Sequence, residues 1–202
     1  MVTIGIIVVS VIFSLLAFNN AAIFNKYLFS PYAAFHYKQY YRIFTHAFLH
    51  GDYAHLGFNM FALYMFGQKI EEEAFPVLFG EKAIFYYILL YVGGIFFSSV
   101  YEFFKQRNNT TYSSVGASGA VNAVVFSAIL IDPAMGLYLM FIPIAIPAWI
   151  FGILFLAYSW YMAKRGGDNI GHNAHFFGAL FGLLFTLALK PTLLGYFIGQ
   201  IF

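Results

Sequence analysis

The chain has 202 residues, of which 62% are hydrophobic and only 9% are charged, and its formal net charge is +2. Soluble domains carry roughly 25% charged residues, so this composition excludes a soluble globule and is typical of a membrane protein. The weak net charge, without a run of Lys and Arg, argues against a nucleic-acid partner. The sequence contains no cysteine, which excludes disulfides and thiolate chemistry.

Six apolar segments predict an all-α, polytopic chain, because about 18 apolar residues span a bilayer core of about 30 Å. The first lacks a basic n-region and a small-residue cleavage site, so it is predicted to be a retained span rather than a signal peptide. We expect one membrane-embedded domain over residues 1–202, with spans at about 4–18, 53–70, 83–104, 117–131, 147–162 and 173–189.

Three connections have distinctive compositions. Residues 19–51 form a long polar and aromatic connection, and residues 164–171 form a Gly-rich polar loop. Pro143 and Pro147 interrupt the apolar stretch before the fifth segment, so residues 135–146 are expected to be interfacial or irregular. The apolar tail, 191–202, is too short to cross a bilayer.

A serine stands at the start of the fourth segment, within Gly116-Ala117-Ser118-Gly119. Glycines allow another backbone to approach, and the first N–H groups of a helix lack partners within it. The backbone N–H of Ser118 is therefore a candidate donor to a developing oxyanion. The alternative is an N-cap serine in a small-residue packing face. The motif also departs from the Gly-x-Ser-x-Gly pattern of a nucleophile elbow, since residue 120 is Ala.

Histidine recurs at the start of the sixth segment, in His172-Asn173-Ala174-His175. His175, Gly178 and Gly182 share one helix face, and the two glycines form a groove that brings helices close. Packing on the fourth segment would bring His175 to Ser118, as a base beside a nucleophile. A packing histidine or a proton relay is the alternative, and His172 is expected to be a loop residue. The fourth segment offers three small residues for the contact: Gly119, Ala120 and Ala123.

A cluster of histidines precedes and enters the second segment. His55 and Asn59 are i, i+4 neighbours that can both donate hydrogen bonds to one point, such as an oxyanion. His46 and His50 have the same spacing, and one interpretation of the histidine cluster is a metal site. Asp52 is the only acidic residue nearby, so we expect His46 and His50 to be structural residues that tie the 19–51 connection to the helix end.

Three motifs resemble those of the rhomboid family of intramembrane serine proteases. The first is the histidine-containing stretch from Arg42 to Asn59, the second is Gly116-Ala117-Ser118-Gly119, and the third is Ala174-His175-x-x-Gly178-x-x-x-Gly182. Gly67 and Glu71, at the end of the second apolar segment, also match the family. The resemblance covers the chain from about Tyr41 to Leu189.

The resemblance implies a six-helix core that cleaves transmembrane segments of other membrane proteins without a cofactor or metal. It implies Ser118 as nucleophile and His175 as general base, with an oxyanion hole from His55, Asn59 and the Ser118 backbone N–H. Gly116, Gly119 and Gly178 would support the site. The family also favours a bacterial inner membrane and a site open to the extracytoplasmic side. A count of Lys and Arg instead places residues 19–51 in the cytoplasm.

Two positions depart from the family's usual pattern. Tyr41 replaces a tryptophan and keeps an amphipathic ring. Asn122 stands where well-known bacterial members have an aromatic residue that stacks on the catalytic histidine. Our hypothesis is that Asn122 holds the His175 ring by a hydrogen bond, direct or through water. Asn122 or Asn173 would then take the orienting role that a carboxylate fills elsewhere, because an ionised carboxylate is costly inside a membrane.

Two further functions are alternatives. A catalytically inactive relative would bind and route membrane proteins, but such proteins typically lack the residues corresponding to Ser118 and His175. A small transporter with a His/Asn relay would be expected to have inverted repeats or acidic residues inside its spans, and the sequence indicates neither.

Overall fold

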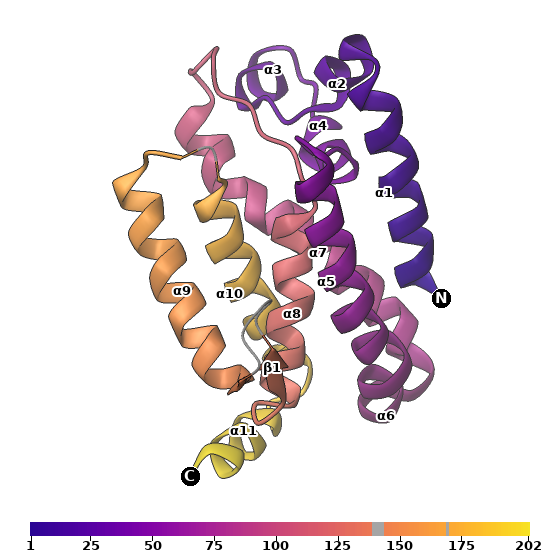
Figure 1. Cartoon of the computed structure of the whole chain (residues 1–202), viewed down its shortest axis with the longest axis vertical. Coiled ribbons are helices and arrows are strands. Elements are labelled where there is room, and N and C mark those ends of the chain that lie inside the picture. Colours follow the sequence, from indigo (N-terminus) through magenta and orange to yellow (C-terminus); the bar gives the residue numbers. More distant parts are fainter. Residues whose placement is uncertain (139–143, 169) are drawn as a thin grey trace.

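The computed structural model describes residues 1–138, 144–168 and 170–202. The fold is mostly helical, as predicted, and a helix lies at each of the six apolar segments. These helices form one bundle with α8 inside it (Figure 1). They are α1 (Val2–Phe18), α5 (Tyr53–Gln68), α7 (Ala83–Gln106), α8 (Ser118–Ile131), α9 (Ala148–Arg165) and α10 (His172–Leu189).

Length and composition identify two helical stretches of the described residues as able to cross a membrane. They are 53–106, which includes α5 and α7, and α10. Helices α1 and α8 are apolar but shorter than 18 residues. The helices therefore agree with the predicted segments in position, while a crossing by all six remains part of the functional proposal below.

The long connection after α1 is folded at one end of the bundle, at the top of Figure 1. Asn20 and Ser30 cap two of its helices by accepting backbone hydrogen bonds. Arg42 donates from Nη1 to the carbonyls of Asn25 and Leu28, at 2.8 and 2.9 Å. This connection, loop one below, contains α2 (Ala21–Tyr27), α3 (Pro31–His36), α4 (Arg42–Thr45) and a 3₁₀ turn (His46–Phe48).

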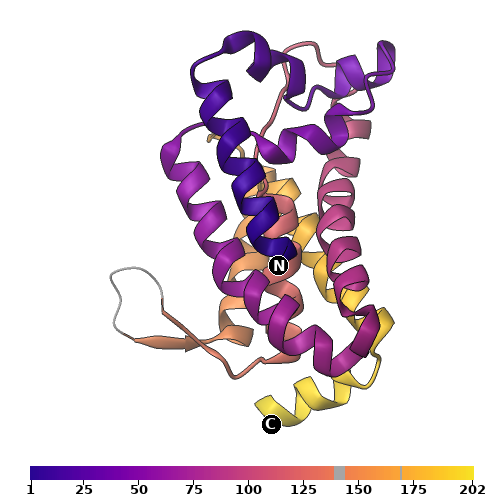
Figure 2. The ribbon, with the colours of Figure 1, turned by 90° about the vertical axis from the view of Figure 1, so that its right-hand side faces the viewer.

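The opposite end of the bundle has short elements. After α5 come a π-helix (Lys69–Ala74), α6 (Phe75–Phe79) and a 3₁₀ turn (Gly80–Lys82), and α11 (Leu193–Ile201) follows α10. Strands β1 (Gly136–Tyr138) and β2 (Ala145–Pro147) pair antiparallel, with Gly136 opposite Pro147. They project from the bundle in Figure 2. Within the connection predicted to be irregular, residues 139–143 lie outside the described residues.

A buried polar cluster holds α1 against α5 and α7. The Glu71 carboxylate accepts hydrogen bonds from the Val2 and Thr3 backbone N–H groups at the start of α1, where an acidic group also suits the helix dipole. Thr3 Oγ1 lies 2.6 Å from Tyr87 Oη. A Cβ atom at Gly67 would lie 2.7 Å from that hydroxyl, so only glycine fits there.

Helices α8 and α10 are in backbone contact through glycines. A Cβ atom at Gly178 would lie 2.1 Å from the Gly119 carbonyl oxygen, and one at Gly182 would lie 2.1 Å from the Ala123 carbonyl oxygen. The predicted small-residue contact is thus confirmed. Toward the C-terminal ends of the same two helices, Thr186 Oγ1 donates to Ser127 Oγ at 2.7 Å.

Candidate active site

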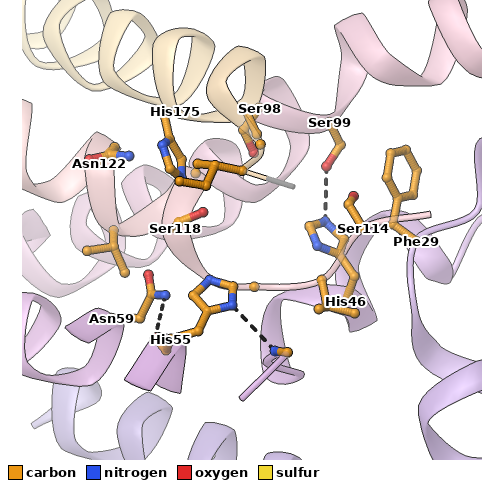
Figure 3. A pocket seen from close by; sticks show the side chains of 18 of the residues that line it. Phe29, His46, His55, Asn59, Ser98, Ser99, Ser114, Ser118, Asn122 and His175 are labelled. Carbon is orange, nitrogen blue, oxygen red and sulfur yellow. Dashed lines mark hydrogen bonds between the residues drawn. The ribbon is translucent and has the colours of Figure 1, made fainter. Parts of the chain in front are cut away.

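A cavity of about 710 Å³ lies where loop one meets the helix bundle. Its walls come from α5, α7, the segment before α8, and α8, α9 and α10. The cavity brings together five of the residues that the sequence singles out: His55, Asn59, Ser118, Asn122 and His175. In Figure 3, Ser118 lies between His175 on one side and the His55–Asn59 pair on the other.

Ser118 is the first residue of α8, and loop one fixes the chain that leads to it. Phe29 and Ser114 exchange two backbone hydrogen bonds, at 2.9 and 3.0 Å, and the Gly116 N–H donates to the His46 carbonyl at 3.0 Å. Gly116 has a φ of +123°, a conformation that favours glycine. The N–H groups of the first turn of α8, including that of Ser118, have no acceptor within the helix.

The burial of α8 isolates two side chains. From Ser118 to Leu130, every residue is buried except Ser118 and Asn122. These two are i, i+4 neighbours and both line the cavity. The helix thus presents one hydroxyl and one amide to a cavity while its remaining surface packs against the bundle.

His175 approaches the same point from the first turn of α10. Its ring lies 6.2 Å from the Phe155 ring of α9 and 6.1 Å from the His172 ring. Among the hydrogen bonds of the described residues, none joins Ser118 Oγ to His175. Hydrogen bonds between nucleophile and base are often long in free enzymes and tighten when substrate binds, so this geometry is compatible with a dyad.

His55 and Asn59 present donors to the cavity from α5. His55 Nδ1 accepts a long hydrogen bond of 3.4 Å from the Gly51 N–H, which assigns the ring proton to Nε2. A Cβ atom at Gly116 would lie 2.8 Å from that Nε2, so glycine is needed for this close approach. Asn59 Nδ2 uses one hydrogen on the His55 carbonyl at 2.9 Å and retains a second.

His46 and His50 make structural contacts. His46 Nε2 lies 3.0 Å from Ser99 Oγ on α7, and His50 Nδ1 lies 2.9 Å from Ser14 Oγ on α1. Burial lowers the pKa of His46 to about 4 and that of His50 to about 3, so both rings are neutral at pH 7. They tie loop one to two helices of the bundle. Within the described ranges, no three His, Cys, Asp or Glu side chains are grouped as metal ligands.

The two asparagines differ in their contacts. Within the described part of the chain, Asn122 makes no direct hydrogen bond to His175. A hydrogen bond between them through a water molecule stays a prediction. Asn173 Nδ2 donates to Glu102 Oε1 of α7 at 2.6 Å. The aromatic neighbour of the His175 ring comes instead from α9, as Phe155.

Sequence reasoning missed several residues near the cavity. Glu102 lies inside the predicted third span, so the statement that the spans contain no acidic residue is wrong. The expectation that His172 is a loop residue is also wrong, because it begins α10, is buried and lies 3.0 Å from Asp168. An ionisable residue within an apolar segment was the signal available for Glu102. Phe155 had no such signal.

Two comparisons with known proteins bear on the family of the chain. The family model described as "Rhomboid domain" matches residues 37–192. The chain is 29% identical over 177 residues to "RHOMBOID-like protein 12, mitochondrial" of Arabidopsis thaliana. That alignment covers 80% of this chain and 50% of the relative, so the chain spans about half the length of the curated relative it matches. With the family model matching most of its length, this chain belongs to the rhomboid family.

Proposed function

We propose that this chain is an intramembrane serine endopeptidase with a Ser118–His175 dyad. The observation that supports this most strongly is the backbone contact of α8 and α10 at Gly119 and Gly178. That contact brings the first turns of the two helices to one cavity, which both Ser118 and His175 line. Membership of the rhomboid family adds to the proposal.

In the proposed reaction, Ser118 Oγ attacks the scissile carbonyl carbon while His175 accepts the hydroxyl proton. The carbonyl oxygen gains negative charge, which the Ser118 N–H, His55 Nε2–H and the second Asn59 amide hydrogen stabilise. His175 then donates its proton to the leaving amine, and water hydrolyses the acyl-enzyme by the same route. Removal of one oxyanion donor costs about 10²–10³ in rate in comparable enzymes.

The proposed substrate is a transmembrane segment of another protein. All six long helices of the bundle would then lie in the bilayer, with loop one and the cavity near one surface. The substrate must reach the cavity in an extended form, because a helix uses its carbonyls in its own hydrogen bonds. Since the chain has no native cysteine, a single cysteine placed at the exposed Arg165 would report the orientation through its access to a thiol reagent.

Labelling by a serine-directed mechanism-based probe tests the dyad. We expect the wild type to be labelled and Ser118→Ala and His175→Ala to fall to background. Ser10→Ala and His36→Ala are matched controls that should label as the wild type does. Ser10 is a buried hydroxyl on α1 without a hydrogen-bond partner among the described residues, and His36 is exposed on α3.

Equal labelling of the wild type and both dyad variants would refute the proposed chemistry. A wild type that folds and inserts, but is neither labelled nor able to cleave a transmembrane reporter, would favour the non-catalytic alternative. The bacterial inner membrane suggested by the motif resemblance also stays a prediction, and fractionation of the native host checks it. The relative described above is named as mitochondrial.

A further inference from the structure

Glu102 is a buried carboxylate that the proposed dyad chemistry does not use. It lies on α7, is 7% exposed and lines the same cavity as Ser118. Its Oε1 accepts the 2.6 Å hydrogen bond from Asn173. Its Oε2 is buried without a hydrogen-bond partner among the described residues. Burial of a carboxylate oxygen without a hydrogen-bond partner is unfavourable, so this oxygen lacks a donor.

The chain supplies no cation to Glu102. No Lys or Arg lines the cavity, and all ten Lys and Arg residues of the sequence lie in the described ranges. The two nearest in sequence contact other groups, because Lys105 lies over the Tyr101 ring and Arg107 over the Phe35 ring. His46, across the cavity wall, is neutral at pH 7 because burial lowers its pKa to about 4.

The groups around Glu102 favour a hydrogen-bond donor as the missing partner. Ser98 and Ser99 commit their hydroxyl hydrogens to the Ile95 carbonyl, at 3.0 and 2.9 Å, so they present lone pairs rather than donors. Burial and the nearby Glu102 charge raise the pKa of Tyr112 to about 12, so its hydroxyl stays un-ionised. One carboxylate among hydroxyl oxygens suits an ammonium or guanidinium group, which carries several donors.

The site lies about one helical turn from the nucleophile. Ser98 and Glu102 are i, i+4 neighbours on α7, separated by about 6 Å along the helix. A Cβ atom at Gly119 would lie 2.2 Å from Ser98 Oγ, so Ser98 touches the first turn of α8 directly beside Ser118. A long side chain on a substrate residue next to the scissile bond spans such a distance.

We propose that Glu102 is the specificity-determining residue of a subsite that receives a Lys or Arg side chain of the substrate. This inference rests on the proposed protease function and names its substrate class, a transmembrane segment with a basic residue beside the scissile bond. Lys and Arg near the ends of such segments extend their charge toward the membrane surface, where loop one lies in the proposed arrangement.

The test is a set of otherwise identical transmembrane reporters with Lys, Met or Glu placed in turn at the three residues on each side of the scissile bond. At one position, the wild type should cleave the Lys reporter at least about 30-fold faster in kcat/KM than the Met reporter, as for a buried charge pair. The Glu reporter should be slowest. Glu102→Gln keeps an acceptor for Asn173 but removes the charge, and should bring the Lys-to-Met ratio near one while it still cleaves the Met reporter.

The control is Glu73→Gln, which removes an exposed carboxylate of the π-helix and should keep the wild-type ratio. Cleavage of Lys and Met reporters at equal rates by the wild type at every position overturns the subsite, even if Glu102→Gln does not fold. Serine-directed labelling separates the two hypotheses. A labelled wild type without a Lys preference refutes the subsite alone, whereas a wild type that is never labelled refutes the protease.

Discussion

Substitution of Gly178 by alanine tests whether the close contact of α8 and α10 positions the proposed dyad. The added Cβ would lie 2.1 Å from the Gly119 carbonyl oxygen and 2.8 and 2.9 Å from the carbonyl carbon and Cα of the same residue. These are backbone atoms, so no side chain can rotate away. Since Cβ contacts below 3.0 Å essentially do not occur, the two helices must separate by about 0.9 Å at this point.

The magnitude follows from two opposing effects. Overpacking of a close contact costs about 1–3 kcal/mol, while alanine gains up to about 1 kcal/mol over glycine in helix propensity. We therefore expect a net loss of about 1–2 kcal/mol in stability. The effect on activity should be larger, because a displacement of about 1 Å at a catalytic pair costs about 10²-fold in rate.

The assay combines the thermal midpoint in detergent with the rate of serine-directed labelling for purified Gly178→Ala. The matched control is Gly5→Ala in α1, where an added Cβ meets nothing within 4 Å. We expect a small fall in the midpoint and a labelling rate about 100-fold lower for Gly178→Ala, with neither change in the control. A Gly178→Ala protein that labels at the wild-type rate would falsify the claim that this contact positions Ser118 against His175.

Four other predictions can be checked with the same preparations. Burial lowers the pKa of His46 from 6.5 to about 4, so between these pH values the imidazole is protonated in the unfolded chain and neutral in the folded chain. About 3 kcal/mol of stability should therefore be lost as pH falls from 6.5 to 4. Denaturation at several pH values should show this slope, and His46→Gln should reduce it. Phe155→Leu removes the ring beside His175 and should lower kcat for a reporter by about tenfold with little change in KM. Asn122→Ala should also slow cleavage, and a rate equal to that of the wild type rejects a water-mediated role for Asn122. Thr186→Val leaves the buried Ser127 hydroxyl without its partner and should lower stability by about 1–3 kcal/mol without changing the reporter's KM.

The sequence predicts the helices well because long apolar segments and their polar ends are local features. The α5 start is an example, since Asp52 caps it by accepting from the His55 N–H at 2.7 Å. The predicted groove of Gly178 and Gly182 also identifies its partner helix correctly, because only small residues permit such an approach. Loop one was harder to predict, since Arg42 organises it through backbone carbonyls that no residue pattern reveals.

The candidate pair can be identified from the amino-acid sequence, because Ser118 and His175 are reactive side chains in apolar segments and glycines that allow close helix contact lie beside them. The residues that surround this pair become visible only in the folded chain. Phe155 reaches the His175 ring from α9, and Glu102 reaches the cavity from α7, through packing between helices far apart in the chain. Whether a buried carboxylate has a counter-ion depends on distances across the bundle, which the order of residues does not contain.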